Sequence, residues 1–323
     1  MPQTARMSQT TNEFWLKLLF KVKLYEAYGD AFQNLFSRLM ELSNPKFQSV
    51  VPWGDWGDGG NDGWIQDDGH YFQVYGPKPT TKDTGTEALK KAIADFDKLP
   101  KKWANVRRYS FVFNDRYCGI PAPLGSAMQK LKIDKSLDET GVKGCKELTD
   151  IFMILPETKR QEIIPGIPAG QPDYFDPRCV GELLSNLADN ANSGFSYLSG
   201  SAPDFDEKIK INGLTAPISE FIKHHFWHVS VVDEFLDARG SGLQQAISEE
   251  IRTLYKASKE AIPDSDLDAP NIRYAWLLEH LIPPVARTHP HSLAAYRNAA
   301  QIVISKYFET CDAYEHPVSL NTK

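Results

Sequence analysis

A run of ten residues rich in glycine and aspartate, GDWGDGGNDG at positions 54 to 63, constrains the fold more than any other segment. Glycine and aspartate favour tight turns, because glycine adopts positive φ and an aspartate side chain hydrogen-bonds nearby backbone. Two short segments rich in β-branched and aromatic residues flank the run, FQSVVPW (47 to 53) and HYFQVYG (70 to 76). The pattern predicts two strands joined through this turn.

Periodicity on either side extends the strand pair into an α/β domain. Apolar residues at helical spacing predict a helix over about 13 to 42, closed by Asn44-Pro45. A second helix, capped by Thr86, is predicted over 87 to 98, and RYSFVFND (108 to 115) predicts a further strand. The expected order is therefore helix, strand, strand, helix, strand.

The second half of the chain has a different pattern. The run IIPGIPAGQPDYFDP (163 to 177) is dense in proline and glycine, which indicates a linker or irregular connection. After it, apolar residues recur at helical spacing over 243 to 255, 272 to 278 and 293 to 308. We therefore expect two domains, residues 1–165 of the α/β class and residues 166–323 mostly α-helical.

Composition narrows the class of protein without fixing its chemistry. The net charge is −6 over 323 residues, so charge alone does not indicate a nucleic-acid-binding protein. No apolar run approaches the roughly 20 residues that cross a bilayer, and no signal peptide is evident. The four cysteines include no C-x-x-C pair. We expect a cytoplasmic protein with reduced thiols and no membrane contact.

The turn and the strand after it carry the residues of a metal site. A metal-dependent phosphodiesterase needs oxygen ligands for Mg²⁺ and a cation beside the reacting phosphate. Asp62 ends the turn, and Gln73 follows 73 − 62 = 11 positions later, which is a hairpin's length. The alternative interpretation is that the glycines and aspartates only shape a tight loop.

This arrangement resembles the PD-(D/E)XK nuclease superfamily, most nearly its Mrr-like branch, in which a G-D-x-G-x-D turn precedes a Q-x-K strand. The resemblance implies a restriction-endonuclease-like αβββαβ core and an Mg²⁺ or Mn²⁺ ion held by Asp62 and Gln73. It also implies a polar group on the first helix, for which Glu26 is the candidate. The residue two after Gln73 is Tyr75 and not lysine, so Lys78 is expected to supply the cation.

The stretches KIKINGLTAPISEFI (208 to 222) and IVISKYFETCDAYEHP (302 to 317), together with the N-terminal motifs, resemble effector subunits of ABC-three-component systems of the Lamassu anti-phage type. The resemblance implies an SMC-like ABC ATPase and a small middle subunit as partners, DNA as substrate, and self-association in the active state. Glu309, Asp312 and Glu315 are spaced three apart, so repulsion among them calls for a cationic partner, which suggests an interface or else a solvated helix end.

Two functions are therefore expected, and a third, hydrolysis of a nucleotide or another small molecule, would need a closed pocket at this loop instead of an open groove. The first is a metal-dependent DNA endonuclease effector of a defence complex, with Asp62, Gln73, Lys78 and Glu26 at its active site. The alternative is a catalytically inactive nuclease-fold adaptor that binds DNA or the ATPase partner, as the tyrosine at position 75 favours. We expect Trp53, Trp56 and Trp64 to pack around the hairpin, and HHFWH (224 to 228) to lie on a partly buried helix.

Overall fold

The computed structural model describes residues 3–81, 83–168, 175–191, 204–239, 241–309 and 314–315. The chain divides into two compact units. Lys23–Ile163 form the N-terminal unit, and Met1–Val22 with Ile164–Lys323 form the C-terminal unit. The chain thus passes between units at Ile163, near the expected boundary at residue 165. The first 22 residues, which we expected in the N-terminal domain, belong to the C-terminal unit.

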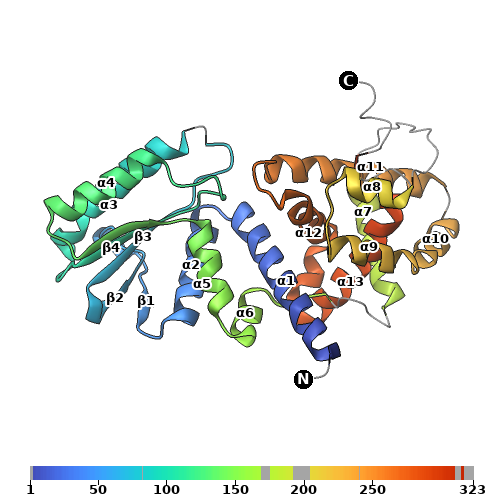
Figure 1. Ribbon diagram of the computed structural model, residues 1–323, viewed down its shortest axis with the longest axis horizontal. Helices are drawn as coiled ribbons and strands as arrows, with labels where there is room; N and C mark the ends of the chain where they lie inside the picture. Colours follow the sequence, from blue (N-terminus) through green and yellow to red (C-terminus); the bar gives the residue numbers. More distant parts are fainter. Residues whose placement is uncertain are drawn as a thin grey trace. The chain divides into compact units, whose positions relative to one another are not determined.

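The N-terminal unit is a five-stranded mixed sheet with helices on both faces (Figure 1). Its strands are β1 (Phe47–Ser49), β2 (Gly63–Ile65), β3 (His70–Tyr75), β4 (Arg108–Phe113) and β5 (Glu139–Lys143). Its helices are the last residues of α1 (Gln3–Glu26), α2 (Gly29–Ser43), α3 (Thr84–Lys102), α4 (Ala122–Asp134), α5 (Cys145–Ile154) and α6 (Glu157–Ile163). The strands follow one another in chain order; β1, β2 and β3 pair antiparallel, whereas β3, β4 and β5 pair parallel.

The single helix expected over 13 to 42 is wrong, because the chain forms two helices there. The break is at Gly29, whose φ is +50° and whose N–H donates to the carbonyl of Gly76, 2.8 Å away. Glycine tolerates this left-handed conformation, which ends one helix and redirects the chain into the next. The strand expected over 47 to 53 is also shorter than predicted, since β1 ends at Ser49 and a 3₁₀ turn, η1 (Gly54–Trp56), follows.

Two apolar layers enclose the sheet. On one face α3 and α4 pack over alternate residues of β3 and β4, and the buried side chains are Tyr71, Ala88, Ala92, Phe96, Leu99, Tyr109, Phe111, Phe113, Leu124, Met128, Leu131 and Leu137. On the other face Phe36 of α2 contacts Phe47 and Phe72, with ring centroids 5.8 and 5.6 Å away. Because strand side chains alternate between faces, Gln73 points to the same face as Tyr71 and Tyr75, which α3 covers.

The C-terminal unit is helical throughout its described residues. Its helices are most of α1, then α7 (Pro177–Asn190), α8 (Phe205–Ile211), α9 (Ile218–Phe226), α10 (Ser230–Asp237), α11 (Ser241–Ala261), α12 (Ala269–Leu281) and α13 (Pro290–Glu309), with a 3₁₀ turn η3 (Pro284–Thr288). Residues 299 to 305 of α13 are all buried, so this helix is surrounded by its neighbours, among them α7 and α9. Trp15 of α1 is fully buried and stacks on Phe221 of α9, with ring centroids 5.6 Å apart.

Candidate active site

The acidic loop of residues 57 to 62 lies directly against helix α3. Gly60 has φ +80°, and a β-carbon at this position would lie 2.1 Å from the carbonyl oxygen of Asp95. The Gly60 N–H donates to the Asp58 carboxylate (2.8 Å), and the Trp103 indole N–H donates to the Asp58 carbonyl (3.1 Å). Only glycine fits so close to the α3 backbone. The glycines therefore have a packing role, as the simple turn interpretation requires, and they also hold the acidic residues in place.

Asp62 immediately precedes β2 and faces β3. The β2–β3 register pairs Gly63 with Phe72, so continued by one residue it places Asp62 opposite Gln73. The carboxylate of Asp62 accepts a hydrogen bond from the Val74 N–H at 2.7 Å, and its side chain is almost fully buried. The structure thus brings together the two residues that the sequence assigns to a metal.

Burial dominates the electrostatics of Asp62. Loss of water around the carboxylate raises its pKa from 3.8 to about 6, and the nearby carboxylates of Asp58 and Asp95 act in the same direction. The Val74 N–H and the Lys91 ammonium lower this pKa. A carboxylate that is costly to ionise and lies near two others is stabilised by any cation that binds beside it.

Gln73 lies in the middle of β3 and is 2 % exposed. Its Oε1 atom has no hydrogen-bond partner. An unsatisfied buried acceptor costs roughly 1–3 kcal/mol, so such an atom calls for a ligand. Asn61, next to Asp62, also leaves its Nδ2 atom without a partner, although its Oδ1 accepts from the Gly63 N–H at 3.1 Å.

The donor set suits a hard divalent ion. Mg²⁺ commonly takes one or two protein oxygens and completes its octahedron with water and substrate oxygens. Asp62 and Gln73 supply a carboxylate and an amide oxygen on adjacent strands. Among the residues that the structure describes, no group of three or more His, Cys, Asp or Glu side chains could hold a metal. The residues therefore fit Mg²⁺ or Mn²⁺ held by few protein ligands, and not a fully enclosed metal site.

The other two predicted site residues lie elsewhere in the N-terminal unit. Lys78 is exposed on the segment after β3, where it lines a surface cavity of about 610 Å³ with Tyr28 and Asp30. Glu26 is exposed at the last residue of α1. That end of α1 is fixed to the residue after β4, since the Asn114 side-chain amide donates to the carbonyls of Leu24 and Ala27 at 2.9 and 2.7 Å. Asp62 and Gln73 are thus the pair that the structure places in register.

Helix α3 adds two residues that the motif did not identify. Lys91 donates to Asp95 at 2.8 Å, and Lys98 donates to the other oxygen of the same carboxylate, also at 2.8 Å. Asp95 is 5 % exposed, although it lies between the buried apolar residues Ala92 and Phe96. A charged residue on the apolar stripe of an amphipathic helix is the sequence signal that would have pointed to it.

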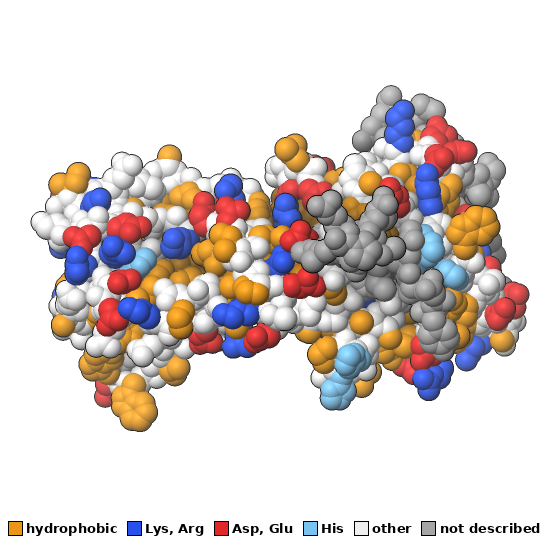
Figure 2. All heavy atoms as spheres, turned by 60° about the horizontal axis from the view of Figure 1, so that its bottom comes forward, with side chains coloured by type: hydrophobic (Ala, Val, Ile, Leu, Met, Phe, Trp, Pro, Cys, Tyr) orange, Lys and Arg blue, Asp and Glu red, His pale blue; other side chains and the backbone are white. Residues whose placement is uncertain are grey.

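Tryptophans surround the acidic loop in two different ways. Trp64 and Trp56 pack on Trp103, with ring centroids 5.0 and 5.2 Å apart, as expected for packing around the hairpin. Trp53, by contrast, is 81 % exposed. Figure 2 shows acidic and basic side chains intermingled over the face in view, with no extended field of one sign.

The two clusters noted in the C-terminal half have local explanations. His224 and His228 have ring centroids 5.7 Å apart, but α9 ends at Phe226, so only the first of them lies on that helix. Glu309 lies 3.9 Å from Lys306, and Glu315 lies 2.6 Å from Lys259. Asp312 and Cys311 lie outside the described residues.

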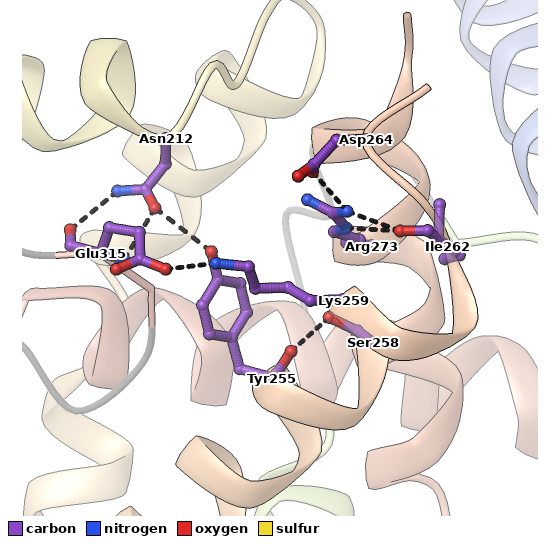
Figure 3. A network of polar contacts seen from close by, with 8 residues as sticks. All are labelled: Asn212, Tyr255, Ser258, Lys259, Ile262, Asp264, Arg273 and Glu315. Carbon is purple, nitrogen blue, oxygen red and sulfur yellow. Dashed lines mark hydrogen bonds and ion pairs between the residues drawn. The ribbon is translucent and has the colours of Figure 1, made fainter. Parts of the chain in front are cut away.

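The cation that meets Glu315 therefore comes from the same chain. Figure 3 shows the arrangement, in which the Asn212 side chain also bonds the Glu315 backbone twice, accepting from its N–H at 2.8 Å and donating to its carbonyl at 3.0 Å. Glu315 therefore needs no cationic partner from another protein, because Lys259 of the same chain supplies the charge.

Comparison with known proteins identifies the second unit. Residues 178–315 match the family model of C-terminal domain 10 of the ABC-three component (ABC-3C) systems. The match supports membership of the chain in such a system, and membership implies a multi-component complex. No curated protein and no solved structure matches the chain. None of the helices in the described parts of the chain has the length and apolar character needed to span a membrane.

Proposed function

We propose that the chain is the effector component of an ABC-three component anti-phage system and that its N-terminal unit is a metal-dependent DNA endonuclease. The observation that carries the proposal is the cross-strand pair in which the buried Asp62 carboxylate stands opposite Gln73, whose buried Oε1 has no partner. The strand order is also the one that a restriction-endonuclease-like αβββαβ core would have, with α2 before β1, β2 and β3, and α3 before β4.

Asp62 and Gln73 would hold an Mg²⁺ or Mn²⁺ ion in this proposal. When bound, such an ion polarises a phosphoryl oxygen and lowers the pKa of a coordinated water. The Asp62 carboxylate neutralises part of the charge and is fixed in direction by the Val74 N–H. Gln73 contributes its amide oxygen from the strand that α3 covers. Glu26 and Lys78, exposed at the end of α1 and after β3, are assigned no part in this chemistry.

The C-terminal unit would join the chain to its partners. We assign to it the binding of an SMC-like ABC ATPase and a small middle subunit in the cytoplasm, with self-association accompanying activation. The support is the family match over residues 178–315, which covers α7 to α13. DNA is the proposed substrate because the candidate site matches the requirements of phosphodiester hydrolysis.

A second candidate function is a nuclease-fold adaptor without catalysis. Tyr75 favours it, because this residue occupies the position where the resemblance calls for lysine. The 4 % exposure of Asp62 and the 2 % exposure of Gln73 also favour it, since substrate must reach them. Such an adaptor would bind DNA or the ATPase subunit and would release no cleaved product.

Plasmid cleavage by the full chain distinguishes the two. The protein is incubated with supercoiled plasmid and Mg²⁺ or Mn²⁺, alone and with the neighbouring components of its system. Asp62→Asn keeps an acceptor for the Val74 N–H while it removes the charge, and it should lower cleavage by at least about 100-fold. Asp55→Ala, which changes an exposed acid in the turn η1 just before the loop, should cleave like wild type. Equal cleavage by wild type and Asp62→Asn would overturn the assignment, and no cleavage in any mixture would leave the adaptor.

A further inference from the structure

The site described above has ligands for a metal but no cation on β3. Tyr75 takes the position two residues after Gln73, stacks on Phe113 (ring centroids 6.1 Å apart) and donates from its hydroxyl to the Glu87 carboxylate at 3.0 Å. Glu87 lies on α3, in the first turn of the helix. Tyr75 therefore does not replace the charge of a lysine, but it ties the end of β3 to α3.

This tie sets the alignment of α3 along β3. One helical turn from Glu87 leads to Lys91, a rise of about 6 Å, and two strand residues back from Tyr75 lead to Gln73, about 6.6 Å. As the helix that connects the parallel strands β3 and β4, α3 runs back along β3, so both steps go in the same direction. Lys91 is thereby placed at the level of Gln73 along the strand, on the helix that covers this face of the sheet.

A second contact fixes the other side of this alignment. One further turn of α3 leads from Lys91 to Asp95, and the Asp95 backbone lies against Gly60 of the acidic loop. Between these two contacts the Tyr109 hydroxyl donates to the Ala92 carbonyl at 3.2 Å. Lys91 thus lies between the Tyr75–Glu87 contact and the Gly60–Asp95 contact, beside the pair formed by Asp62 and Gln73.

We propose, resting on the proposed nuclease function, that Lys91 supplies the cation of this site from helix α3 and that Asp95 positions it. The Lys91 ammonium would donate to a non-bridging oxygen of the scissile phosphate. One water adds to phosphorus and one P–O ester bond breaks, which gives a phosphate monoester and a free hydroxyl. The charge that builds on the phosphate during this step is what the ammonium stabilises.

The contacts of Lys91 suit this role. Its side chain is 38 % exposed, so its ammonium is accessible from solvent, whereas Asp95 is buried and is shared with Lys98. When Lys91 turns to a phosphate, Asp95 keeps an ion pair and is not left as an unpaired buried charge. The Lys91 charge also lowers the pKa of Asp62, as an ammonium near that carboxylate does.

The test compares Lys91→Ala with Lys90→Ala in the full chain, under the conditions in which wild type cleaves plasmid. Lys90 is the exposed neighbour on the same helix, and its substitution should leave cleavage unchanged. Lys91→Ala should lose at least about 100-fold in rate, the cost of removing one donor to developing charge. Added ethylammonium should restore part of the cleavage rate of Lys91→Ala and should not increase the cleavage rate of the other proteins. Mn²⁺ affinity, measured by calorimetry, should be equal to or tighter than that of wild type, because a neighbouring cation has been removed.

The outcomes separate this inference from the function on which it rests. If wild type cleaves, Asp62→Asn does not and Lys91→Ala cleaves like wild type, Lys91 has no such role while the nuclease stands. If Lys91→Ala loses cleavage and Mn²⁺ binding together, without rescue by amine, its role is structural and the proposal is wrong. If wild type never cleaves, the proposed function and this inference fail together.

Discussion

Replacing Asp62 by asparagine should make the protein more stable at neutral pH and less stable relative to wild type as the solution becomes acidic. The reason lies in the burial of this carboxylate, which raises its pKa from 3.8 to about 6. A carboxyl with a raised pKa binds its proton more tightly in the folded than in the unfolded chain. Wild-type stability from this group is therefore present below pH 3.8 and is lost as the pH rises to about 6.

The size of the effect follows from the shift. About two pKa units, at 1.36 kcal/mol each, amount to about 3 kcal/mol. The stability gained by Asp62→Asn should grow by most of this amount between pH 4 and pH 7.5 and then level off. Asparagine keeps an acceptor for the Val74 N–H. Any free-energy cost of its new amide protons is the same at every pH, so it shifts the stability difference without changing its dependence on pH.

Urea denaturation of wild type and Asp62→Asn at half-unit steps from pH 4 to pH 8 measures this difference. A stability gap that stays constant across the range would refute the reasoning, because it would mean that Asp62 ionises as easily in the folded chain as in the unfolded one. Repeating the series with Mn²⁺ adds a control. The ion should stabilise wild type at pH 7.5 and leave Asp62→Asn unchanged, since it binds the charged carboxylate.

Two further substitutions, one with a matched control, test the packing of the two units by urea denaturation. Gly60→Ala should lower the free energy of unfolding by about 3 kcal/mol and displace the acidic loop. The control Gly54→Ala, with a φ of +46° but no atom within 4 Å, should lower it by about 1 kcal/mol. Equal losses for the two variants would contradict the close approach of Gly60 to α3. Arg297→Met should cost about 3–5 kcal/mol, because Arg297 is buried and pairs at 2.7 Å with Glu279, whose side chain is 13 % exposed. A loss below 1 kcal/mol would show that Arg287 alone satisfies Glu279.

The strands β3 and β4 beside the acidic loop were predictable because their signals are local. HYFQVYG and RYSFVFND are rich in aromatic and β-branched residues and alternate little, as expected of buried central strands, and they form β3 and β4. The break between α1 and α2 was not predictable in this way. It depends on the bond from Gly29 to Gly76, a residue far away in the sequence, and the apolar spacing continues across the break.

The edge strand β5 was missed for a different reason. Its sequence, ETGVK, is short and polar, and no residue of it is fully buried. Only pairing with β4 makes it a strand, because an edge strand needs one neighbour and little apolar surface. For helix α13 the periodicity was correctly predicted, but its full burial was not. The continuous burial of residues 299 to 305 depends on helices from distant parts of the chain.

The candidate site could be predicted only in part from the sequence. Asp62 and Gln73 are separated by a hairpin's length, and the register of β2 with β3, continued by one residue, places them opposite each other. The strand β2 itself was not predicted, since the sequence indicated a turn leading directly from the first strand to HYFQVYG. Lys78 was chosen because it is near in sequence, yet it lies past the end of β3 and is exposed. The proposed cation, Lys91, lies 18 residues after Gln73, on a helix that packs back over the strand. Sequence distance is a poor guide where a helix covers a strand.

The division of helix α1 between the units makes the N-terminal unit an insertion within the C-terminal one. The polypeptide leaves the C-terminal unit after Val22 and returns to it at Ile164. A graft that exchanges the N-terminal unit for another domain would thus need two splice points. A C-terminal fragment that begins at residue 164 would lack the first part of α1, whose Trp15 contacts Phe221 and Tyr274. Such a fragment would expose aromatic surface and aggregate, whereas a fusion of residues 1–22 to residues 164–323 through a short flexible linker would keep that surface covered.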